Sequence, residues 1–77
     1  MTEQALERLQ PKSRATLETF SMSIWRAKQE DNQEMRTEFS MKLKGYLRAL
    51  IDSSVLTDLE SMVLYLYFIG KDWTDKN

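Results

Sequence analysis

Apolar side chains recur at intervals of three and four residues along most of the chain, which is the spacing of a helix face. Gly and Pro are scarce, at two and one, and no long stretch rich in Ser or Pro interrupts the pattern. We therefore predict an all-α fold, a small bundle of three principal helices plus a short N-terminal helix, in a single domain over residues 1–77. The predicted helices cover residues 3–9, 11–28, 32–52 and 58–69, followed by a flexible tail over 71–77.

Local signals define the predicted helix boundaries. Pro11 is tolerated in the first turn of a helix but not in its interior, so the second helix is predicted to begin there. Asn32 is a turn former in a polar connection between helices. Thr57, followed three residues later by Glu60, matches a capping box and predicts the start of the last helix. Gly70 is expected to end that helix in a left-handed conformation.

The segment MVLYLYFIG, residues 62–70, carries no charge and no side-chain amide. Several of its residues favour strands, but the capping box before it and the lack of another strand pattern favour a helix. One side of this helix is predicted to face the core, and it carries Leu59, Met62, Val63, Leu66 and Ile69. The full predicted core is Leu17, Phe20, Ile24, Phe39, Leu43, Tyr46, Leu47, Leu50, Leu59, Met62, Val63 and Leu66.

The opposite side of the last helix is also apolar and leaves two interpretations open. Leu64, Tyr65 and Phe68 either pack within the chain or form an exposed patch for a partner. We favour a non-enzymatic protein-protein interaction module in which this patch binds a second copy or an amphipathic helix. Trp25 and Trp73 are candidate aromatic anchors for the same contact, because large rigid side chains dominate contact energies. Both also fit as ordinary core residues.

Composition excludes several kinds of chemistry. The chain has no Cys and no His, which removes disulfides, nucleophilic thiols and the usual ligands of zinc, copper and haem. Its acidic residues are explained by helix capping and solvation, so we expect no enzyme, no cofactor and no metal. The charged N-terminus does not resemble a secretory signal, and the last helix is too short to span a membrane. A cytoplasmic protein is the expectation.

A nucleic-acid-binding regulator is the alternative function. The second and third helices each carry excess positive charge, and Lys12, Arg14, Lys44 and Arg48 would contact phosphates. The net charge of the chain is −1, however, which is far from the basic balance of most DNA-binding domains. A solvated face with ion pairs such as Glu38 with Lys42 explains the same residues. Salt separates the two functions, since phosphate binding weakens steeply as salt rises.

Overall fold

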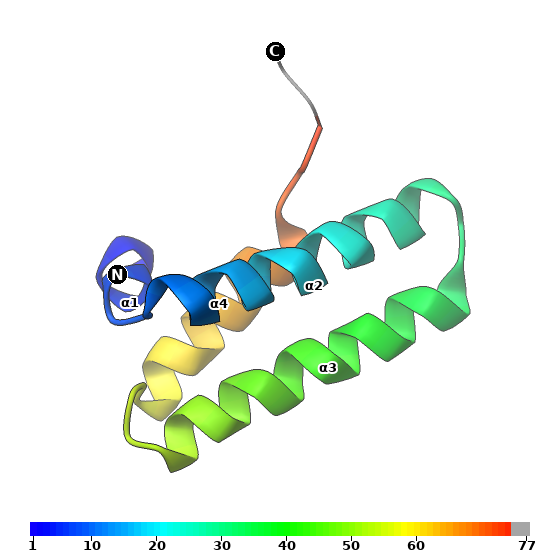
Figure 1. Cartoon of the computed structure of the whole chain (residues 1–77). Coiled ribbons are helices and arrows are strands. Elements are labelled where there is room, and N and C mark those ends of the chain that lie inside the picture. The colour runs from blue at the N-terminus through cyan, green and yellow to red at the C-terminus, as the bar shows by residue number, and fades with distance from the viewer. Residues whose placement is uncertain (75–77) are drawn as a thin grey trace.

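The computed structural model describes residues 1–74, which form four helices and no strand. The all-α prediction is confirmed, and each helix boundary lies within two residues of its predicted position. The helices are α1 (Thr2–Glu7), α2 (Pro11–Gln29), α3 (Gln33–Asp52) and α4 (Asp58–Gly70) (Figure 1).

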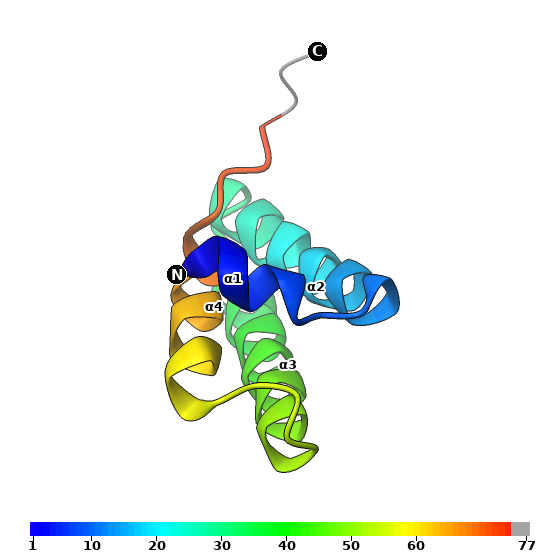
Figure 2. The ribbon, with the colours of Figure 1, turned by 90° about the vertical axis from the view of Figure 1, so that its left-hand side faces the viewer.

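Helices α2 and α3 run side by side in opposite directions and form the long hairpin of the fold (Figure 1). Helix α4 packs against α1, α2 and α3, and so connects every part of the bundle. Figure 2 shows α4 at one edge of the bundle, with α1 beside it. One side of α4 must therefore face the other helices, and the opposite side has no helix next to it.

One cluster of buried apolar side chains, drawn from all four helices, forms the core. The predicted core residues Leu17, Ile24, Leu43 and Leu47 are confirmed as buried. Half-buried aromatic side chains extend the cluster between α2 and α3, where the ring of Phe20 lies near those of two α3 residues. The buried cluster contains Ala5, Leu6, Leu9, Leu17, Ile24, Leu43, Leu47, Leu56, Leu64 and Phe68.

Two of the helix ends use a left-handed residue that is not glycine. Asp31 has φ 53° after α2, and Ser54 has φ 62° after α3. In both places the next residue donates its N–H five residues back, Asn32 to the carbonyl of Ala27 and Val55 to that of Leu50. This is the Schellman arrangement, which satisfies carbonyls left free at a helix end.

The start of α4 agrees with its predicted signal, whereas its end does not. The capping box of Thr57 and Glu60 is present in full. The prediction that Gly70 ends the helix in a left-handed conformation is wrong, because Gly70 is helical and Lys71 continues in an extended conformation. The chain leaves α4 along an extended path, so no tight turn is needed at the glycine.

Candidate functional site

The orientation of α4 is the opposite of the one predicted. Leu64 and Phe68 are 0% and 1% exposed and belong to the core, together with the small side chain of Ser61 between them and the capping box. The prediction that Leu64 and Phe68 form an exposed partner patch is therefore wrong. Tyr65 is half-buried at the side next to α3, where the Lys44 ammonium lies 5.6 Å from its ring centre.

The residues predicted to face the core lie instead on the surface. Leu59 is 49% exposed, Met62 is 55% exposed and Leu66 is 63% exposed. We refer to these three residues as the outer stripe of α4, since their spacing of three and four places them along one side of the helix. Val63 is half-buried at its edge. The predicted core position is wrong for all three residues of the outer stripe.

Polar contacts from α2 fix this orientation at the end of α4. The last carbonyls of a helix have no partner within the helix and need one elsewhere. The hydroxyl of Ser21 donates to the carbonyl of Phe68, and the ammonium of Lys28 donates to that of Ile69 at 2.7 Å. The positive charge of Lys28 also favours the negative end of the helix dipole. These two side chains hold the C-terminal turn of α4 against α2.

The segment after α4 is tied to the same place. The indole N–H of Trp73 donates to the Ser21 hydroxyl oxygen at 2.7 Å, and the Lys71 ammonium lies 4.8 Å from the Trp73 ring centre. Residues 71–74 of the predicted flexible tail thus make contacts with the bundle and with each other, and the rest of that tail, 75–77, lies outside the described residues; its flexibility stays a prediction. Trp73 therefore anchors its own chain, while Trp25 is half-buried in α2. Partner binding by either tryptophan stays a prediction.

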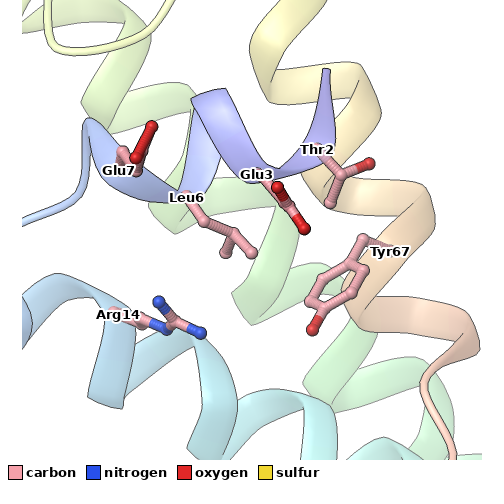
Figure 3. A pocket seen from close by; sticks show the side chains of 6 residues that line it. All are labelled: Thr2, Glu3, Leu6, Glu7, Arg14 and Tyr67. Carbon is pink, nitrogen blue, oxygen red and sulfur yellow. The ribbon is translucent and has the colours of Figure 1, made fainter.

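Two surface grooves flank α4, one on each side. The first lies between α1, α2 and α4 and has a volume of about 650 Å³. Figure 3 shows Leu6 pointing into it, with Glu3 and the hydroxyl of Tyr67 on the α1 and α4 sides and Arg14 opposite them. Arg14 is also 3.5 Å from the carboxylate of Glu18 in its own helix. This groove therefore combines an apolar floor with charges of both signs.

The second groove lies between α3 and α4 and has a volume of about 320 Å³. Its apolar part comes from Met41, Tyr65 and Ile69, and its charged part comes from Arg36 and Lys44. Within residues 1–74, neither cation has a carboxylate within ion-pair distance. We refer to this site as the α3 groove. Sequence reasoning missed Arg36, Met41 and Ile69, because only the rotation of α4 reveals them as neighbours.

The four candidate nucleic-acid-binding residues do not form one surface. Arg14 lines the groove next to Tyr67, whereas Lys44 lines the groove next to Tyr65 on the other side of α4. Arg48 is 3.5 Å from the carboxylate of Asp52, and Lys12 is exposed near the start of α2. The predicted pair of Glu38 with Lys42 is present at 3.2 Å. Nucleic-acid binding by these residues stays a prediction.

The carboxyl of Glu60 has a structural role. It accepts the N–H of Thr57 at 2.9 Å and forms an ion pair with Arg8, which links α1 to the start of α4. The backbone hydrogen bond from Thr57 and the positive charge of Arg8 lower its pKa below the ordinary value of 4.5. Helix capping and ion pairing therefore account for the shifted pKa without any catalytic function.

Residues 1–74 contain neither a metal-binding cluster of side chains nor a membrane-spanning helix. No group of three or more acidic side chains is close enough to hold a metal ion. None of the helices in the same range has the length and apolar character needed to cross a membrane.

Comparison with known proteins gives no relative for this chain. No family model matches its sequence, and no curated protein or solved structure matches it either.

Proposed function

We propose that this chain is a non-enzymatic protein-interaction module whose contact surface is the outer stripe of α4. The observation that carries the proposal is the exposure of Leu59, Met62 and Leu66, at 49%, 55% and 63%, along one side of a single helix. Each such side chain gains about 1.5 to 3 kcal/mol when it moves fully out of water. A partner that covers the stripe would bury these side chains, and much of that free energy would then stabilise the complex.

The occupant that suits this surface is the apolar face of a helix from another polypeptide. The stripe extends about 10 Å along α4, from Leu59 to Leu66, and the 13 residues of the helix span about 20 Å. A helix laid along it would insert side chains between those of the stripe, as helix pairs commonly do. Charged residues at both ends, Asp58 and Lys71, would surround the apolar contact with a polar rim. A cytoplasmic location is part of the same proposal.

Site-specific photo-crosslinking tests the proposal in the cells that produce the protein. Leu66 is replaced by the photoreactive residue p-benzoylphenylalanine, and Met22, 41% exposed on α2, is replaced in the matched control. We expect a crosslinked polypeptide from position 66 and none from position 22. The second substitution Met62→Glu should remove the crosslink without changing the melting temperature. A chain that gives no crosslink at position 66 would contradict the proposed function.

A further inference from the structure

The outer stripe of α4 has opposite charges near its two ends, on the side that faces α3. Asp58 is the first residue of α4, and the α3 groove with Arg36 and Lys44 lies towards the other end of the helix. At about 100° per residue, Asp58 lies within about 20° of both Tyr65 and Ile69, the residues of α4 that line this groove. The acidic and basic ends therefore share one edge of the stripe, about 16 Å apart along the helix.

This arrangement is complementary to itself. Consider two copies related by a two-fold axis that lies in the contact plane at right angles to α4. The axis reverses the direction of α4 in the second copy, but the edge of the stripe that faces α3 stays on the same side of the contact in both copies. Asp58 of each copy then faces the α3 groove of the other, and the two helix dipoles are antiparallel. A parallel pair, related by a two-fold axis along α4, would instead place each Asp58 on the edge away from the α3 groove of the other copy, and would align the dipoles. Charge therefore favours the antiparallel arrangement.

Building on the proposed function, we infer that the partner is a second copy of this chain, bound as an antiparallel dimer through the outer stripe. Full overlap of the two α4 helices places Leu59 of one copy opposite Ile69 and Gly70 of the other. Gly70 has open space where a side chain would stand, so this end of the helix can admit Leu59. Each Asp58 carboxylate then approaches Arg36 and Lys44, which have no carboxylate partner among residues 1–74 of their own chain.

The available area indicates a weak dimer. A standard interface buries about 800 Å² on each partner, roughly 15% of the 5370 Å² that this chain exposes. The whole outer side of α4, about 20 Å by 10 Å, covers only about 200 Å² of flat surface. The contact must therefore extend over the α3 groove, where Met41 is 67% exposed. We expect a dissociation constant of roughly 10 to 100 μM, as for small transient interfaces.

Sedimentation equilibrium of the purified protein, from about 5 to 500 μM, tests the association itself. We expect a monomer–dimer equilibrium that Leu66→Glu abolishes, while the melting temperature measured at low concentration stays unchanged. Asp58→Asn should weaken the dimer roughly 2- to 10-fold, because two exposed ion pairs are lost. Unchanged or tighter association of Asp58→Asn would overturn the antiparallel arrangement, because that arrangement requires attraction between Asp58 and the basic residues of the α3 groove.

Cysteine crosslinking tests the orientation, and the absence of native Cys makes the result unambiguous. Leu59→Cys and Gly70→Cys chains are mixed and oxidised. We expect a disulfide between positions 59 and 70, and none between two copies of position 59, which lie about 16 Å apart along the helices in this dimer. A 59–59 disulfide without the 59–70 product would overturn the proposed orientation.

The two proposals fail in different ways. A wild-type chain that stays monomeric to 500 μM overturns the dimer, even if position 66 crosslinks a different polypeptide in cells, and that result leaves the interaction function intact. No crosslink at position 66 to any polypeptide, in a chain that is also monomeric, overturns both.

Discussion

Phe68 and Leu66 lie two residues apart on α4, and the structure gives them opposite roles in stability. Phe68 is 1% exposed, and its ring lies 5.0 Å from that of Tyr67 in an edge-to-face arrangement. Replacing a buried Phe with Ala costs about 3 to 5 kcal/mol, through lost burial and the cavity left behind. Leu66 is 63% exposed. Its replacement by Ala should change the free energy of unfolding by less than about 0.5 kcal/mol.

These magnitudes are large relative to the stability of the whole chain. At about 0.05 to 0.15 kcal/mol per residue, a domain of this size has a free energy of unfolding of roughly 4 to 12 kcal/mol. Phe68→Ala should therefore remove about a quarter of it or more. With a urea m-value of about 1 kcal/mol/M, the unfolding midpoint should fall by roughly 3 M. Leu66→Ala should leave the midpoint within about 0.5 M of wild type.

Urea titration followed by far-ultraviolet circular dichroism measures both variants. A protein concentration of about 2 μM keeps any dimer dissociated, so that the midpoint reports the monomer. Phe68→Leu is the milder companion variant for the case in which Phe68→Ala does not fold, and its expected loss is about 1 to 2 kcal/mol. If Leu66→Ala costs as much as Phe68→Ala, the orientation of α4 described above is wrong.

Three further predictions follow from the ends of the helices. Ser54→Gly should stabilise the chain by about 0.5 to 1 kcal/mol in thermal or urea unfolding, since glycine adopts a positive φ without steric cost; no gain would contradict the left-handed conformation. Ser21→Ala should destabilise by about 1 to 3 kcal/mol, by removing the donor to a buried carbonyl. In a Trp25→Phe background the same change should shift Trp73 emission to longer wavelength, whereas unchanged emission would contradict the Trp73 contact. The lowered pKa of Glu60 adds stability that is present above pH 4.5 and is lost as the pH falls through the folded-state pKa, so wild type should lose more stability than Glu60→Gln on acidification.

The sequence predicts the helices of this fold better than it predicts their rotation. Pro11 and the capping box at Thr57 act through the local backbone, so both boundaries follow from neighbouring residues alone. On α2 and α3 one side is clearly more apolar, which is why Leu17 and Leu43 could be assigned to the core. The left-handed conformation predicted at Gly70 is wrong. The last carbonyls of α4 accept hydrogen bonds from side chains far away in the sequence, so no glycine turn is needed to satisfy them.

Helix α4 is apolar on both sides, so periodicity cannot decide which side turns inward. Counting apolar residues favours the side with Leu59, Met62, Val63, Leu66 and Ile69. The observed inward side includes Ser61, whose small side chain allows close approach, and Phe68, the largest side chain that is fully buried. The sequence does contain a signal for this orientation. Thr57 is followed at helical spacings of four and three by Ser61, Leu64 and Phe68, which places all four residues along the inward side. The significance of this signal depends on α1 and α2, which pack against that side.

The way α4 is held explains how one helix can serve both a core and a contact surface. Its first turn is capped by its own residues and linked to α1 through Arg8, and its last turn is bound by Ser21 and Lys28. These polar contacts, together with burial of Leu64 and Phe68, fix the helix without any contribution from the outer stripe. Substitutions on the stripe should therefore change association without changing folding. For the same reason, a variant at Phe68 cannot test association, because it removes the core on which the stripe is displayed.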